Sequence, residues 1–217
     1  TYENKKMSII SIKRNHLKFE KNINELIEYG LEIITENVTV KKDKIIKKEK
    51  NILLESLLLR SCAYWENFLE KEIIILISLN SDKFKLKMEL PSYIKLNLKL
   101  IRAILYGDEY RDFHDITHSK SYFSKILVKE YNPFKKITGE RLKKINITYI
   151  IRNYLSHYSE YSKKKLCQAY VDNFKYKIFQ EPGIFLLKEK GKYFENLIHN
   201  FVLVSVNMRS YLGVKDG

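Results

Sequence analysis

The sequence predicts an all-α protein built as an up-and-down bundle of helices. Glycine and proline, which most often interrupt helices, occur only seven and three times in 217 residues. Over several long segments, apolar residues recur at the three- and four-residue spacing of amphipathic helices. A chain of this length can bury a core without disulfides or structural metals. We therefore expect a single helical domain over residues 1–217.

In the first half of the chain, helical segments alternate with polar breaks. The expected elements, in order, are a strand (8–12) or an extended arm within 1–15, a helix at 16–37, a lysine-rich loop at 39–49, a helix at 51–79, a loop at 80–91 and a helix at 91–106. The helix at 51–79 has an apolar stripe wide enough for the centre of a bundle. Pro91 suits the first turn of a helix, and Gly107 suits its end.

The second half of the chain is punctuated by capping residues. The expected elements are a polar, irregular segment at 108–121, a short helix at 122–131, a helix that begins near 138–140, a turn at 158–162, a helix at 163–174, a hairpin or loop at 176–187 and an amphipathic helix at 192–211. Thr138 is the expected N-cap of the helix that carries residues 150–157, and Ser162 is that of the next helix.

Charge and cysteine content limit the possible partners and compartment. A net charge of +14 favours a polyanion such as nucleic acid, because lysine and arginine neutralise phosphates. It can equally reflect a base bias of the gene, since lysine, isoleucine, asparagine and tyrosine are all abundant. Cys62 and Cys167 form no disulfide framework or zinc pattern, which fits a reducing cytoplasm. We expect no signal peptide, because no apolar segment follows the basic start, and the most apolar run, Ile73–Leu79, is too short for a membrane span.

The segment from Ile150 to Tyr158 has the most distinctive chemistry. On a helix, Ser156, Asn153 and His157 lie at about 40°, 100° and 140° from Arg152, so the four polar side chains share one face. The apolar residues on the opposite face are Ile147, Ile151, Tyr154, Leu155 and Tyr158. The segment would bury the apolar face and present a cation, an amide, a hydroxyl and an imidazole. Alternatively, it is a solvent-facing helix end, where a histidine suits the helix dipole.

Other histidines give weaker signals. His114 and His118 are four residues apart, with Asp112 and Asp115 nearby, so they form either a metal site, if helical, or a polar surface loop. His199 is expected to be packed or half-exposed, and His16 is expected in a helix-cap region. We expect no metal and no cofactor.

The segment Arg152-Asn153-Tyr154-Leu155-Ser156-His157 resembles the Arg-x4-6-His motif of the HEPN superfamily, including the polar residue directly after the arginine. An upstream segment, Arg60-Ser61-Cys62-Ala63-Tyr64-Trp65-Glu66-Asn67-Phe68-Leu69-Glu70, is similar to the aromatic and acidic segment of several bacterial HEPN subfamilies. The resemblance covers roughly residues 16–175. It leaves 176–217 as a C-terminal extension with one helix, and residues 108–131 as a candidate insertion.

This resemblance implies a HEPN-type bundle, here with extra peripheral helices, that forms a homodimer in which two Arg/His pairs build one cleft. Many members are metal-independent endoribonucleases that act as toxins or antiviral effectors, which implies RNA as substrate and a cognate antitoxin or defence-system protein as partner. Others are catalytically silent. The alternative function is therefore a non-catalytic dimeric module that binds RNA or protein.

The residues fit ribonuclease chemistry. RNA supplies its own nucleophile, the 2′-hydroxyl, and His157 can accept or donate the proton. Arg152 can bind the scissile phosphate, and Asn153 can orient His157 or bind the phosphate. Ser156 can assist or simply be small enough for close helix approach. The candidates for RNA binding are Ser156, Lys163, Lys164, Lys165 and Tyr158, although the lysines can equally be a solvated helix start.

Overall fold

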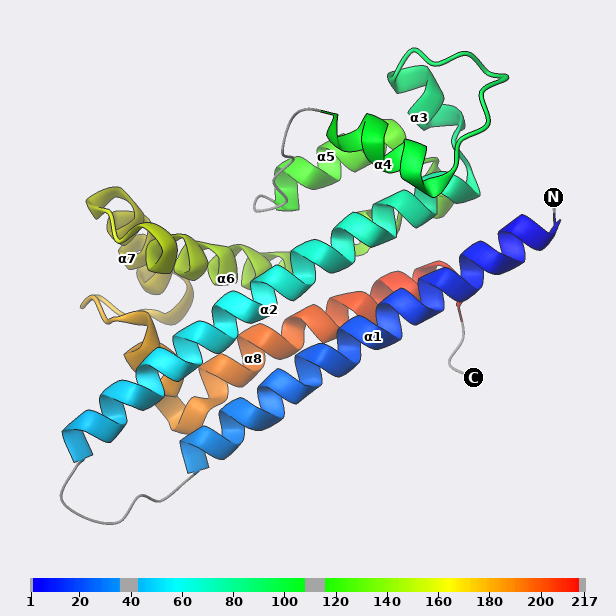
Figure 1. Ribbon diagram of the computed structural model, residues 1–217. Helices are drawn as coiled ribbons and strands as arrows, with labels where there is room; N and C mark the ends of the chain where they lie inside the picture. Colours follow the sequence, from blue (N-terminus) through cyan, green and yellow to red (C-terminus); the bar gives the residue numbers. More distant parts are fainter. Residues whose placement is uncertain (1, 36–42, 108–115, 215–217) are drawn as a thin grey trace. The chain divides into compact units, whose positions relative to one another are not determined.

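The computed structural model describes residues 2–35, 43–107 and 116–214, and all regular structure in these ranges is helical. The helices are α1 (Tyr2–Thr35), α2 (Asp43–Leu79), α3 (Asp82–Lys87), α4 (Leu98–Tyr106), α5 (Ile116–Ile126), α6 (Gly139–His157), α7 (Glu160–Phe174) and α8 (Pro182–Tyr211), with short 3₁₀ turns η1 (Lys129–Tyr131) and η2 (Pro133–Lys136) (Figure 1). The all-α prediction is confirmed. Among the described helices, none combines the length and apolar character needed to cross a membrane.

Several sequence expectations about element boundaries are wrong. The helix α2 begins within the loop expected at 39–49, α3 lies within the loop expected at 80–91, and α5 begins within the segment expected to be irregular at 108–121. Residues 8–12 belong to α1 and form neither a strand nor an extended arm. The helix predicted to open at Pro91 begins at Leu98, because the side chain of Asn97 caps it by accepting a hydrogen bond from Leu100 N at 2.8 Å. The N-cap of α7 is Ser159 rather than Ser162, and the two serines form a reciprocal capping box.

Of the hairpin or loop expected at 176–187, the loop is found at residues 176–181, which are irregular, and α8 begins at Pro182. Pro182 suits this position because the first turn of a helix leaves its N–H groups without a helical partner. The carboxylate of Glu55 accepts a hydrogen bond from the next N–H, that of Gly183, at 2.7 Å. Further along, α8 is interrupted at Lys188–Gly191, where Gly191 has φ +81° and lies against Ile34 so closely that a Cβ would clash.

The chain divides into two compact units. Unit 1 comprises Thr1–Glu20, Trp65–Leu142 and Leu203–Gly217, and unit 2 comprises Lys21–Tyr64 and Lys143–Val202. The expectation of a single domain over residues 1–217 stays a prediction. In unit 1, Phe19 stacks on Phe68 at 4.5 Å between ring centroids, and Trp65 is fully buried beside both. In unit 2, Tyr170 and Phe185 pack at 4.5 Å.

A chain of buried polar side chains joins α1, α2 and α8 within unit 1. His16, which we expected in a helix-cap region, lies inside α1 and is fully buried. Its Nε2 lies 3.1 Å from Oε1 of Glu72 on α2, and its Nδ1 lies within hydrogen-bond distance of Oγ of Ser205 on α8, at 2.7 Å. Ser205 donates in turn to Glu20, which pairs with Arg209. Each buried polar group thereby gains a partner that water cannot supply.

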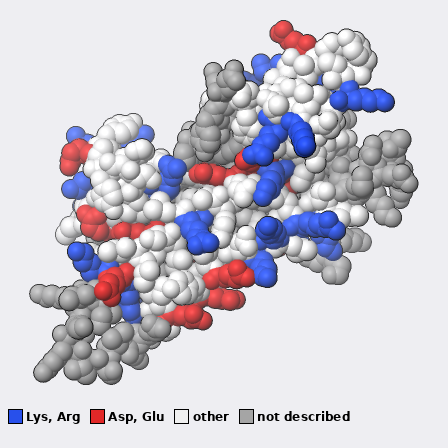
Figure 2. Space-filling model, in the orientation of Figure 1, with Lys and Arg blue, Asp and Glu red and all other residues white. Residues whose placement is uncertain are grey.

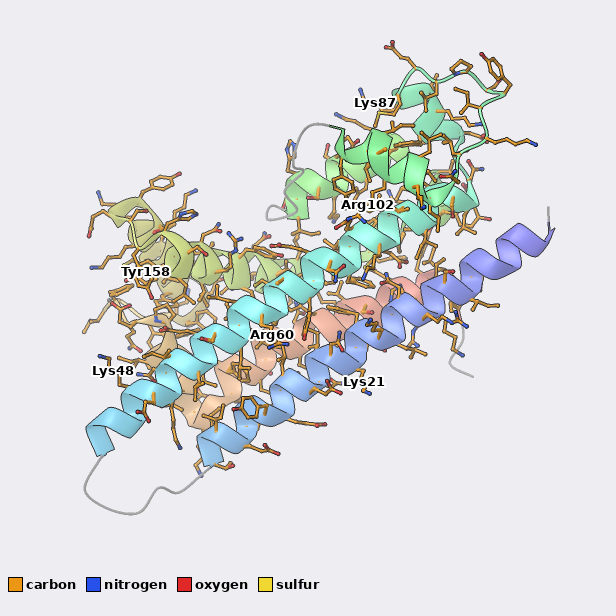
Figure 3. The ribbon with its side chains drawn as sticks, viewed as in Figure 1. Lys21, Lys48, Arg60, Lys87, Arg102 and Tyr158 are labelled. Atoms are coloured by element: carbon orange, nitrogen blue, oxygen red, sulfur yellow. The ribbon has the colours of Figure 1, made fainter. Side chains whose placement is uncertain are left out.

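We predict that Glu72→Ala lowers the free energy of unfolding by about 3–5 kcal/mol, because it strips a buried, hydrogen-bonded histidine of its carboxylate. Glu70 on the same helix is the matched control. It pairs with Arg102, an exposed residue labelled in Figure 3, at 2.7 Å. Glu70→Ala should cost no more than about 1 kcal/mol. Urea unfolding followed by circular dichroism measures both, and equal losses would contradict the assigned role of the buried network.

Candidate functional site

At the end of α6, in unit 2, apolar side chains lie on one face and polar side chains on the other, as the helical spacing predicts. Ile147, Ile151, Tyr154 and Leu155 are buried. On the other face, Arg152 and Asn153 are half-buried, whereas Ser156 and His157 are exposed. Tyr158 departs from the prediction. It is 63 % exposed because its φ of +45° ends the helix before it can join the apolar face.

Arg152 and Asn153 are joined to each other. Nη1 of Arg152 donates a hydrogen bond to Oδ1 of Asn153 at 3.1 Å. This contact orients the amide, so that its nitrogen faces away from the guanidinium. Asn153 also lies one helical turn before His157, and side chains four residues apart are neighbours on a helix surface. Asn153 is therefore placed to link the cation with the imidazole.

The junction of α6 and α7 places His157 at a defined helix end. His157 is the last residue of α6, and the backbone N–H of Tyr158 closes the helix by donating to the carbonyl of Tyr154 at 2.8 Å. Two residues later the Ser159/Ser162 capping box starts α7. His157 therefore lies at a helix C-terminus, with its side chain exposed.

A polar cluster beneath the junction anchors α6 to the start of α8. The hydroxyl of the buried Tyr154 donates to the Glu181 carboxylate at 3.1 Å, and Glu55 caps the helix that follows Glu181. Burial raises the pKa of Tyr154 to about 12, and the Glu181 hydrogen bond and charge act in the same direction. Although most of the Tyr158 side chain is exposed, partial desolvation raises its pKa, and the charges of Glu55 and Glu181 act in the same direction.

Burial likewise raises the pKa of Glu55, against the lowering effect of its hydrogen bond with Gly183 and with a further rise from Glu181. Neither carboxylate stands out in the sequence. The sequence pattern places Glu55 on the polar side of a long helix and Glu181 in a loop. The one available signal was Pro182-Gly183, which marks a helix start in need of an acceptor.

The predicted RNA-binding residues fall into two groups. Lys164 and Lys165 are exposed on the first turns of α7, and Tyr158 is exposed at the junction, where it is labelled in Figure 3. Lys165 also lies 4.6 Å from the ring centre of Tyr161, which is 68 % exposed. Lys163 is half-buried, with its ammonium 5.0 Å from the ring of Phe179, so it is less accessible to a ligand.

Only one of the four candidate metal ligands, His118, lies in the described part of the chain. Asp112, His114 and Asp115 lie outside the described residues, and His118 lies on α5, where its side chain is exposed. Within the described ranges, no three His, Cys, Asp or Glu side chains are grouped to hold a metal ion. His199, expected to be packed or half-exposed, is exposed on α8.

We predict that Tyr154→Phe lowers the free energy of unfolding by about 1–2 kcal/mol, because it removes a hydrogen bond to a charged acceptor from a buried site. Tyr161→Phe is the matched control, since Tyr161 is exposed and its ring contact with Lys165 survives the change. Chemical denaturation measures both. NMR titration of labelled tyrosines in Glu181→Gln should show the pKa of Tyr154 lowered from about 12. An unchanged value would contradict the proposed link between α6 and α8.

No protein-family model, curated protein or solved structure matches this chain. The resemblance to the HEPN superfamily therefore rests on the residues of the motif and stays a prediction.

Proposed function

We propose that the protein is a metal-independent endoribonuclease of HEPN type that acts as a homodimer. The observation that carries this proposal is the arrangement at the end of α6. A half-buried arginine, oriented by Asn153, lies on the same exposed face as an accessible terminal histidine. A cation and a proton carrier on one helix end are the minimum needed to cleave a phosphodiester that supplies its own nucleophile.

The proposed reaction is transesterification. The 2′-oxygen attacks the adjacent phosphorus, His157 of one protomer accepts the 2′-hydroxyl proton, and the bond from phosphorus to the 5′-oxygen breaks. A protonated His157 from the second protomer donates a proton to the departing 5′-oxygen. The products are a 2′,3′-cyclic phosphate and a 5′-hydroxyl. Arg152 binds the non-bridging oxygens, where negative charge develops in the transition state.

Two protomers are needed because a single imidazole cannot accept one proton and donate another in the same step. Apposition of two α6 ends would supply one histidine as base and the other as acid, with two arginines around one phosphate. Ser156 is exposed and small, so it would permit close approach of the two helices.

The neighbouring surface suits a single-stranded RNA. Lys164 and Lys165 can follow the phosphate backbone, and the exposed rings of Tyr158 and Tyr161 offer stacking surfaces for bases. The resemblance further suggests a toxin–antitoxin or antiviral setting with a cognate partner protein. The alternative, a non-catalytic dimeric module, uses the same surface for binding without cleavage.

We predict that purified protein cleaves single-stranded RNA in the presence of excess chelator. His157→Ala and Arg152→Ala should each reduce the rate by at least about 100-fold, the usual contribution of a general acid–base group or of a transition-state charge contact. Gel analysis of end-labelled RNA measures the rate and identifies the cyclic phosphate.

Two matched variants control for simple loss of a surface charge or imidazole. His199 is an exposed histidine on α8, and Arg60 is an exposed arginine on α2 that hydrogen-bonds Tyr64 (Figure 3). His199→Ala and Arg60→Ala should retain full activity. Full activity in the two α6 variants would overturn the site, and RNA binding without cleavage by the wild type would favour the non-catalytic module.

We also predict that Lys164→Ala combined with Lys165→Ala weakens RNA binding uniformly across sequences. Each lost phosphate contact should reduce the slope of log affinity against log salt by about 0.7 for single strands. Fluorescence anisotropy at several salt concentrations measures this slope, with His157→Ala in all samples to prevent cleavage. An unchanged slope would remove these lysines from the proposed RNA path.

A further inference from the structure

Unit 1 contains a groove in which every charged side chain is a cation. The groove has a volume of about 380 Å³ and lies among α1, α2 and the first residue of α4. Its aliphatic wall is formed by Ile74, Ile75 and Leu98. The charged side chains that line it are Arg14, Lys18 and Lys71. Figure 2 shows a group of Lys and Arg side chains over this first half of α1.

The charges of this groove are not neutralised within the described chain. Arg14, Lys18 and Lys71 are exposed, and none of them forms an ion pair with a described acidic residue. Arg14 and Lys18 are one helical turn apart, so they present two cations side by side. The described residues that line the groove include no aromatic ring on which a base could stack, which argues against single-stranded RNA as its ligand.

The second half of α1, in unit 2, carries the complementary surface. Glu25, Glu28, Tyr29 and Glu32 follow the spacing of one helical face, and all four are exposed. Glu25 forms an ion pair with Lys21 at 3.7 Å, whereas Glu28 and Glu32 have no cationic partner among the described residues. Tyr29 is 51 % exposed. Figure 2 shows acidic side chains gathered over this part of α1.

We propose that the groove of one copy of this chain receives the acidic face of α1 from a second copy. Glu28 and Glu32 are one turn apart, the same spacing as Arg14 and Lys18. Tyr29 lies on the same face and offers an amphipathic ring to the aliphatic wall of the groove. A helix laid into a groove between two helices is a common mode of recognition.

A second copy is favoured over an unrelated partner because both halves of the contact are present on this chain, and Arg14, Lys18, Glu28 and Glu32 form no ion pair with one another or with any other described residue. The overall charge of +14 opposes association of two copies, so the contact depends on local complementarity. That dependence makes charge reversal a decisive test.

Sedimentation velocity over a concentration series would compare the wild type with two variants. The first, Arg14→Glu with Lys18→Glu, makes the groove acidic. The second, Glu28→Lys with Glu32→Lys, makes the helix face basic. Each variant alone would place like charges across the contact and should weaken self-association at least about tenfold. An equimolar mixture should restore it, because the acidic groove then meets a basic face and the basic groove meets an acidic face.

A chain that carries all four substitutions should also self-associate, since its reversed surfaces are again complementary. Lys125→Glu with Lys129→Glu changes the net charge as much as the first variant, at exposed positions outside the groove, and should behave as wild type. Wild-type association in either single-surface variant, or no recovery in the mixture, would overturn the proposal. If the wild type and both single-surface variants sediment with the same mass at every concentration, the groove does not bind a second copy and the proposal is wrong.

This contact stands apart from the proposed ribonuclease site. RNA cleavage by the charge-reversed proteins, assayed beside His157→Ala, separates the two. Loss of cleavage only in the α6 variants, with loss of association only in the α1 variants, is the expected result. Failure of the ribonuclease proposal would leave the charge-reversal pattern unchanged, and failure of the α1 contact would leave the chelator-resistant cleavage unchanged.

Discussion

The pairing of buried charges in unit 1 is the constraint on which the arrangement of its long helices depends. A buried carboxylate or imidazole without a partner would cost several kcal/mol, so Glu72, His16 and Glu20 must keep their contacts. The contacts reach from α2 through α1 to α8. Because each hydrogen bond tolerates little displacement, a shift of one helix along another would break several of them together. The aromatic packing of Phe19, Trp65 and Phe68 alone would permit more alternatives.

The polar residues at the end of α6, in unit 2, differ from the buried and paired groups of unit 1. They keep access to solvent and are left with unused hydrogen-bonding capacity, apart from the bond between Arg152 and Asn153. The contacts that hold this helix end in place lie on its buried side. There Tyr154 donates a hydrogen bond to Glu181, and Glu55 accepts one from the first turn of α8. A site held this way is fixed by its backbone and by packing beneath it, so its outward face is available for a ligand.

The sequence predicted this face because periodicity alone decides it. Ile147, Ile151 and Leu155 repeat every four residues, and burying them leaves Arg152 and Ser156 outside. Tertiary contacts were not predictable in the same way. His16 and Glu72 are 56 residues apart, and nothing local shows that they meet. We predicted the start of α4 at Pro91, but Pro91 and Asn97 are both residues that favour a helix start. In the structure the helix starts after Asn97, whose side chain caps it. Membership of the HEPN superfamily stays a prediction, since it rests on the motif at 152–157 and the upstream segment at 60–70, and no family model, curated protein or solved structure matches the chain.

In the proposed assembly, the contact between two α6 ends and the contact between α1 and the groove differ in their charges. Apposing two α6 ends brings Arg152 and the α7 lysines of both copies together, and this like-charge arrangement repels until RNA phosphates neutralise it. The contact between the α1 acidic face and the groove joins opposite charges and needs no RNA. It lies on a surface other than the α6 end, so its loss leaves the apposition of two α6 ends around RNA unchanged. A chain with an excess of cations therefore has one contact that forms between opposite charges and one that closes only around a polyanion.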